Sequence, residues 1–265
     1  MLTGQKFGES LAVQGRVIRA LYLRELKTRF GEKRLGFLWA FGEPIMHILA
    51  FVIIWKLFGR LGPPGIEPML FLITGIIPFI MFSNIINRVL NSVSGNRALL
   101  AFPQVKIIDF VLSRLILEIT TYSVIFIFFI FVFEYFGIFS HVEYPLGVYS
   151  KFLLLALLGG GIGYVLIPVI AIVPFMEQMV KFLIRATYVT SGVFFSIEKL
   201  PMRIRDYIDW NPVLQLLHML RADYFPEIAL KDDFSNLGYI MVLIVMLWLA
   251  GIRLTNKLML HILKD

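Results

Sequence analysis

Long apolar runs separated by short polar stretches dominate the chain. The spans predicted from these runs are 35–58, 69–90, 115–139, 152–173, 180–197 and 237–254. Each run approaches or exceeds the roughly 20 residues that a helix needs to cross a hydrocarbon core about 30 Å thick. A spanning segment must also satisfy its backbone polar groups internally, which favours helices. The pattern therefore predicts an all-α membrane protein with six transmembrane helices.

The stretch 13–30, ahead of the first span, has an amphipathic pattern instead. Val17, Ile18 and Leu21 fall on one half of a helical wheel, while Arg16 and Lys27 fall on the other. Helices of this kind lie in the membrane interface. We therefore expect an N-terminal segment, 1–34, that contains an interface helix, followed by a six-span transmembrane domain, 35–265.

The composition indicates that lipid is the main solvent of the chain. Its 265 residues are 58% hydrophobic and 16% charged. Soluble domains are about 45–50% apolar and about 25% charged on average, so a soluble chain of this size has no interior large enough for so much apolar surface. There is no cysteine, which excludes disulfides, thiolate metal sites and cysteine nucleophiles.

Lys and Arg, which give the chain a net charge of +7, cluster near the ends of the apolar runs. The N-terminal segment and the loop between the second and third spans are basic, while 134–150 contains neither Lys nor Arg. This bias is typical of the positive-inside rule and predicts that both termini are cytoplasmic. Because a membrane accounts for the basic residues, no nucleic-acid partner is expected.

The region 198–236 lies on the external side in this topology and contains both acids and bases. Within it, the stretch YIDWNPVLQLLHML, 207–220, is apolar but too short to span a bilayer. A stretch of this length suits a re-entrant or interfacial helix. A small external subdomain is the alternative.

Polar and ionisable groups inside the spans are informative, because a charge at the bilayer centre costs at least ~2.5–3.5 kcal/mol. Glu43 and His47 lie one helical turn apart and flank Pro44, and Glu118 follows Arg114 by one turn. Such groups predict either the polar lining of a translocation path or an internal pairing that ties helices together. The intramembrane candidates are Glu43, His47, Arg88, Glu118, Tyr122 and Tyr188.

Motifs for catalysis are missing from the sequence, which has no G-x-x-x-x-G-K-[ST] phosphate loop and no H-E-x-x-H zinc motif. The acidic pair of KDDF, 231–234, is expected to lie in a solvated loop. The small residues of GGGIG, 159–163, are expected to let two helices approach closely. We therefore predict no catalytic residue, no metal site and no cofactor bound by this chain.

The loop 95–107 is polar at first and then apolar up to Pro103. A short helix in this loop would project from two long spans on the cytoplasmic side. It would suit a groove on a cytoplasmic partner, which makes the loop the best docking candidate in the chain.

Four stretches resemble, in the same order, those of ABC-2 type permeases, and most closely the capsular polysaccharide export permeases of Gram-negative bacteria. They are LYLRELKTRFGEKRLGFLWAFGEPIMHIL (21–49), GIIPFIMFSNIINR (75–88), NRALLAFPQVKIIDFVLSR (96–114) and WNPVLQLLHMLR (210–221). The resemblance covers most of the chain.

The resemblance implies a homodimer in the bacterial inner membrane, each copy bound to a separate cytoplasmic subunit that holds ATP and magnesium. It also implies an N-terminal interface helix, a coupling helix in 95–107 and re-entrant helices before the last span. The residues then expected to couple to the ATPase are Arg24, Glu25, Arg29, Phe30, Asn96, Arg97, Phe102, Pro103 and Lys106.

The implied substrate is a lipid-anchored acidic polysaccharide that passes to a periplasmic adaptor. The external side chains expected to contact it are Arg203, Arg205, Trp210 and Arg221. An O-antigen, teichoic-acid or drug exporter of the same family is an alternative. A membrane-embedded glycan or lipid transferase is an alternative of another class, although its best acid–base candidates, Glu43/His47 and Asp232/Asp233, are far apart in the sequence.

Overall fold

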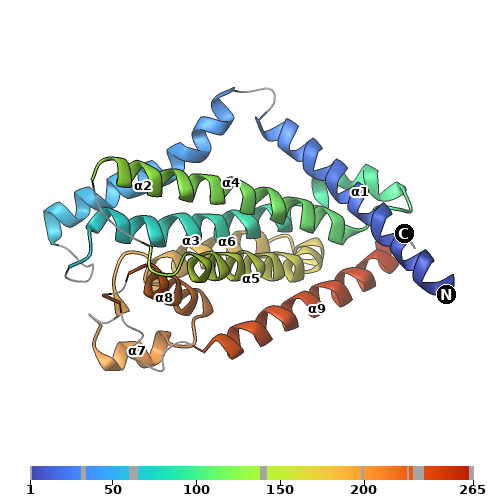
Figure 1. Cartoon of the computed structure of the whole chain (residues 1–265). Helices are drawn as coiled ribbons and strands as arrows, with labels where there is room; N and C mark the ends of the chain where they lie inside the picture. The colour runs from blue at the N-terminus through green and yellow to red at the C-terminus, as the bar shows by residue number, and fades with distance from the viewer. Residues whose placement is uncertain are drawn as a thin grey trace.

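The computed structural model describes residues 2–30, 34–59, 65–137, 142–197, 200–225, 227–228 and 236–262 (Figure 1). Its elements are α1 (Leu2–Phe30), α2 (Arg34–Phe58), α3 (Pro68–Leu90), the 3-10 helix η1 (Ser94–Ala101), α4 (Ile107–Tyr135), α5 (Pro145–Ile172), α6 (Met176–Thr190), α7 (Met202–Ile208), α8 (Pro212–Tyr224) and α9 (Leu237–Ile262). Every one of them is helical, which confirms the all-α prediction for the described part of the chain. The KDDF stretch lies outside the described residues.

Five of the described helices are long and apolar enough to cross a membrane. The candidate spans are Trp39–Leu57, Pro68–Leu90, Ile107–Tyr135, Pro145–Ile172 and Leu237–Lys257. Each of them overlaps one predicted span. The helix α4 begins earlier than the predicted 115, because Asp109 accepts a hydrogen bond from the backbone N of Lys106 at 2.8 Å and so caps its first turn.

The predicted span 180–197 does not form a single helix. The helix α6 has 15 residues and ends at Thr190, which is short of the roughly 20 residues that a span needs. Gly192 then adopts a φ of +69°, a conformation that ends helices. The apolar residues that follow, such as Val193 and Phe194, are buried in irregular chain. The six-span count is therefore not confirmed, and five spans are found within the described residues.

The helix α3 lies at the centre of the bundle, and all of its residues in 70–82 are buried. The helix α5 packs closely against it through glycines. A Cβ on Gly163 would lie 2.8 Å from the Cβ of Val89, and one on Gly159 would lie 3.0 Å from the carbonyl O of Phe82. Small residues at such positions let helix backbones approach, as predicted for GGGIG.

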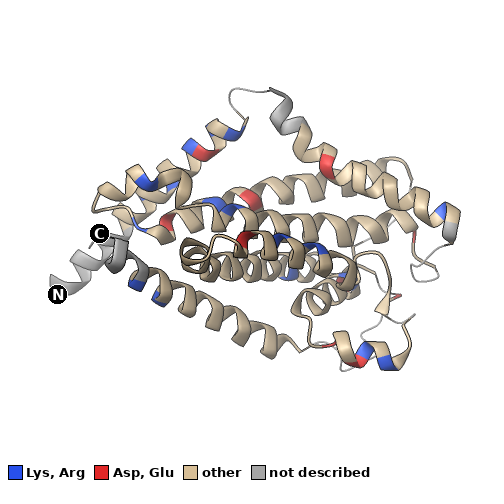
Figure 2. Cartoon of the chain, turned by 180° about the vertical axis from the view of Figure 1, so that it is seen from behind, with Lys and Arg blue, Asp and Glu red and all other residues tan. Residues whose placement is uncertain are grey.

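The two termini and η1 lie at one end of the bundle, and α7 and α8 lie at the other (Figure 1). Figure 2 shows Lys and Arg along α1 and near the neighbouring end of α9, with a long uncharged stretch in the middle of α9. The outward side chains of that stretch are apolar, among them Val245, Met246 and Leu249. This distribution suits lipid around the middle of the bundle and water at its ends.

Candidate functional site

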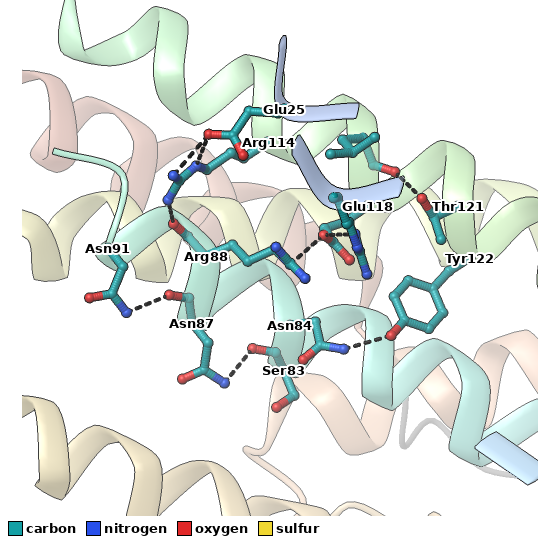
Figure 3. Close-up of polar contacts among 12 residues, drawn as sticks. Glu25, Ser83, Asn84, Asn87, Arg88, Asn91, Arg114, Glu118, Thr121 and Tyr122 are labelled. Carbon is teal, nitrogen blue, oxygen red and sulfur yellow. Dashed lines mark hydrogen bonds and ion pairs between the residues drawn. The ribbon is translucent and has the colours of Figure 1, made fainter. Parts of the chain in front are cut away.

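Charged side chains from the three helices α1, α3 and α4 meet inside the bundle (Figure 3). At the centre is Glu118 of α4, whose side chain is 0% exposed. Its Oε1 lies 2.6 Å from Nε of Arg88 on α3 and 2.5 Å from Nη1 of Arg29 on α1. One buried carboxylate therefore binds two cations from two other helices.

A second ion pair joins α1 to α4. Arg114 lies one turn before Glu118 and donates to Oε1 of Glu25 from Nε at 3.1 Å and from Nη2 at 2.9 Å. Its Nη1 also donates to the backbone carbonyl of Arg88. We call Glu25, Arg29, Arg88, Arg114 and Glu118 the charge network. Two positions one turn apart on α1 thus pair with two positions one turn apart on α4.

The charge network is sensitive to the loss of any member. Removing one partner of a buried ion pair costs about 3–5 kcal/mol, because the other charge stays away from water. The Arg29 and Arg114 side chains are only 15% and 13% exposed, whereas Arg88 is 38% exposed and is screened by water. Oε2 of Glu118 is buried and has no hydrogen-bond partner among the described residues, so this carboxylate depends on its Oε1 contacts.

The same face of α1 contacts the segment between α3 and α4. Arg24 donates to Oδ1 of Asn96 in η1, and Gln14 donates to Oδ1 of Asp109 at the start of α4. Asn96 is buried, and its Nδ2 donates to the carbonyl of Ser92 at 2.8 Å. These hydrogen bonds join α1 to η1 and to the start of α4.

The other side of this segment faces solvent. Its exposed residues are Asn91, Ser94, Gly95, Arg97, Ala98, Ala101, Phe102, Pro103, Gln104 and Lys106. Phe102 is 59% exposed. Cations around a protruding aromatic ring are complementary to an acidic partner surface that contains an apolar pocket.

The coupling residues predicted from the sequence thus fall into two groups. Those that contact other parts of this chain are Glu25, Arg29 and Asn96, and those that are exposed are Arg97, Phe102, Pro103 and Lys106. Arg24 belongs to both groups, because its side chain is 44% exposed and contacts Asn96. Phe30 is half-buried, with the Arg29 guanidinium 5.0 Å from its ring centre.

A second polar cluster lies deeper in the bundle and joins α2, α3 and α4. Asn84 donates from Nδ2 to the hydroxyl of Tyr122 at 2.6 Å (Figure 3), and both groups lie 3.4 Å from Oε2 of Glu43. Glu43 and Tyr122 were predicted from the sequence, whereas Asn84 was missed. Its signal is the run Ser83, Asn84, Asn87 and Arg88, which places polar residues at helical spacing inside an apolar span.

His47 and Tyr188 connect α2 to α6 one turn further along α2. His47 Nδ1 lies 2.6 Å from the Tyr188 hydroxyl, and the Tyr188 ring packs 4.7 Å from the rings of Phe79 and Phe194. These side chains border a groove of about 140 Å³. Its lining residues are Glu43, His47, Phe79, Ile80, Ser83, Ile184, Arg185 and Tyr188.

The predicted external contacts do not form one surface. Arg203 is exposed and Trp210 is 72% exposed, whereas Arg205 is half-buried. Arg221 is a correction to the prediction, since it is only 4% exposed and its guanidinium is bound by carbonyl groups inside the bundle. It is therefore out of reach of an external polymer in this structure.

Among the described residues there is no group of three or more His, Asp or Glu that could hold a metal ion. Glu43 is engaged with Asn84 and Tyr122, and His47 with Tyr188. These polar side chains pair across helices, and Glu43, His47 and Tyr188 also border the groove. Both sequence-based interpretations, a lining and an internal pairing, therefore remain predictions.

Residues 16–225 match the model of the ABC-2 type transporter family. The chain belongs to this family. It is 30% identical to the polysialic acid transport protein KpsM of Escherichia coli over 91% of this chain and 93% of that protein. It is 31% identical to the capsule polysaccharide export inner-membrane protein CtrC of Neisseria meningitidis serogroup A, over 95% and 94%. It is 29% identical to the capsule polysaccharide export inner-membrane protein BexB of Haemophilus influenzae, also over 95% and 94%.

Proposed function

We propose that this ABC-2 chain is the membrane-spanning permease subunit of an ATP-driven exporter that moves capsular polysaccharide across the inner membrane. The observation that carries the proposal is the end-to-end similarity to relatives named for polysialic acid transport and capsule polysaccharide export. The five apolar helices and the polar clusters between them suit a transport subunit that makes and breaks no covalent bond itself.

The energy would come from a separate cytoplasmic ATPase that holds ATP and magnesium. This chain has no phosphate loop of its own. Its exposed Phe102 and the cations around it offer that subunit a docking surface. ATP-driven movement of the partner would press on η1 and α1, and the charge network would transmit the movement to α3 and α4. Coupling of this kind requires elements that shift as packed units.

We place a second copy of the chain against the face formed by α2 and α6. Glu43 and Arg185 border the groove on this face, and lipid would impose a cost of at least ~2.5–3.5 kcal/mol per charge at mid-membrane depth. The exposed side chains of α2, α4 and α9 are all mostly apolar, so the charged groups at the groove are what distinguish the face formed by α2 and α6. A homodimer that meets along α2 and α6 would enclose these charges between the copies and leave the path for the polymer there.

The substrate in this proposal is a lipid-anchored acidic polysaccharide that a periplasmic adaptor receives. The aromatic ring of Tyr188, which is half-buried and borders the groove, suits contact with a sugar ring. Both termini would be cytoplasmic, because α1 and the adjacent end of α9 carry the basic residues (Figure 2).

Deletion of the gene in its host, followed by fractionation of cytoplasm from envelope, tests the proposal. We expect polymer to accumulate inside the deletion strain. Complementation with the gene should restore polymer at the cell surface. Complete absence of polymer would support the transferase alternative. Unchanged surface polysaccharide would reject the capsule substrate and leave an O-antigen, teichoic-acid or drug exporter of the same family.

A further inference from the structure

An irregular segment, residues 191–197, follows α6 at the end of the bundle opposite the termini. We call this segment the break, because the helix stops there while the apolar run continues. The helix ends at Thr190, and Gly192 adopts a φ of +69°. The segment 191–197 is irregular, yet most of its residues are buried. Buried backbone carbonyls require hydrogen-bond donors, and this segment has no continuing helix to supply them.

Arg221 of α8 supplies these donors from outside the segment. Its Nη1 donates to the carbonyl of Gly192 at 2.6 Å, and its Nη2 donates to the carbonyl of Val193 at 2.8 Å. Nη2 also donates to the carbonyl of Phe71 on α3 at 3.0 Å, and the guanidinium stacks 3.6 Å from the centre of the Phe71 ring. Nε lies 3.4 Å from the hydroxyl of Thr74. One planar, fork-shaped cation thus joins the break, α3 and α8.

The surrounding residues are shaped for this contact. A Cβ on Gly75 would lie 2.3 Å from Nη2 of Arg221 and 2.7 Å from the carbonyl O of Val193, so α3 has a glycine where the two meet. Asn211 caps α8, and its Nδ2 donates to the hydroxyl of Ser191 at 3.0 Å. We call Phe71, Thr74, Gly75, Gly192, Val193 and Arg221 the arginine clamp.

A small pocket beside the arginine clamp has a volume of about 10 Å³, which is room for one water molecule. Phe195 and Ser196 of the break and Leu214 and Leu217 of α8 line it. The break and α8 therefore pack closely against each other. Because irregular chain has few hydrogen bonds of its own, the packing of the break on α3 depends on the donors that Arg221 provides.

We propose that Arg221 is a positioning residue that holds the break after α6 and the helix α8 on α3 at the outer end of the subunit. This inference rests on the proposed function in one respect: both termini are taken as cytoplasmic, so the end of the bundle that holds α8 is the outer one. Substitution of Arg221 by Lys keeps the positive charge but replaces the planar guanidinium, with its fork of donors, by a compact ammonium group. Arg221→Lys should release the segment 191–197 and lower polysaccharide export at least tenfold.

Labelling of an engineered cysteine tests the release directly, because the chain contains no cysteine. Ser196→Cys, at a position 5% exposed, reports on the break. Tyr207→Cys, at a position 79% exposed on α7, reports on access from outside. Spheroplasts that express the chain with its ATPase are treated with a membrane-impermeant maleimide, with and without Arg221→Lys. Arg253→Lys, the same substitution at an exposed position of α9, is the matched control.

We expect the cysteine at position 207 to react in all variants. The cysteine at position 196 should react at least tenfold faster in the chain with Arg221→Lys than in the chain with Arg253→Lys or in the chain with both arginines intact. If the Arg221→Lys variant does not accumulate in the membrane, the Gly75→Ala variant is used in its place, since the added methyl group crowds the arginine clamp and leaves Arg221 present. Unchanged labelling of the cysteine at position 196, in whichever of these two variants accumulates, would overturn the proposal.

The labelling does not depend on the polysaccharide, so failure of the capsule substrate leaves its result intact. If Cys at 207 reacts only in inside-out vesicles, the orientation is reversed and the arginine clamp does not lie at the outer end. That outcome would overturn this inference while the deletion experiment decides the proposed function separately.

Discussion

The substitution Glu118→Gln removes the buried charge at the centre of the charge network while keeping the size of the side chain. Loss of one partner from a buried pair costs about 3–5 kcal/mol. The Arg88 contribution is discounted because that side chain is 38% exposed, and the amide oxygen of Gln still accepts a hydrogen bond. The lower limit, about 3 kcal/mol for the pairing with Arg29, is therefore the appropriate figure.

At about 1.4 kcal/mol per factor of ten, this cost raises the population in which α1 has left α4 by about 100-fold. Trypsin measures that population in inside-out membrane vesicles, since Arg24 and Lys27 lie in α1 and are cleaved when the helix opens. Glu118→Gln should raise the cleavage rate by up to about 100-fold, and export should fall because α1 no longer transmits movement to α4.

Glu134→Gln is the matched control, since it makes the same change at an exposed position of the same helix. Arg29→Gln should raise cleavage as much as Glu118→Gln does, and the double variant should be no worse than either, because both remove the same interaction. Equal cleavage and equal export for Glu118→Gln and Glu134→Gln would refute the role assigned to the charge network.

Three further predictions concern other parts of the site. Phe102→Ala should leave the chain in the membrane but reduce co-purification of the ATPase at least tenfold, since it removes a side chain that is 59% exposed; co-purification at the normal level would contradict this. His47→Phe and Tyr188→Phe should each lower export a few-fold and to the same extent, because each leaves one polar group without its partner at a cost of about 1–3 kcal/mol; unequal effects would show that the hydrogen bond is not what matters. Gly163→Val should lower the melting temperature of the purified subunit, because the Cβ atom of the new side chain would lie 2.8 Å from the Cβ atom of Val89. Gly95→Ala should leave the melting temperature unchanged, because a Cβ atom there would have nothing within 4 Å.

The spans were predictable because a run of about 20 apolar residues has few other uses in a chain. The same reasoning failed after Thr190, where the apolar run continues but the helix ends. The donors that stabilise the break come from Arg221, which lies 28 residues beyond Val193. Hydrophobic periodicity carries no information about a contact of this range, so the sequence did not predict where α6 ends or that Arg221 is buried.

The charge network shows the same limit. The spacing of Arg114 and Glu118 predicts two neighbours on one helix, and this is how they lie. Their partners, Glu25 and Arg29, are each 89 residues away in the sequence. Residue types therefore identified the members of the network, whereas only the packing of α1 on α4 shows that they bind each other.

Transport in inside-out vesicles tests the central claim most directly. Vesicles from the host that contain the chain and its ATPase are supplied with the lipid-linked polysaccharide that accumulates in the deletion strain. Polymer protected from an added glycosidase is then measured with and without ATP. The account predicts protection that requires ATP and is lost when this chain is absent. Protection that is equal without ATP, or without this chain, would contradict it.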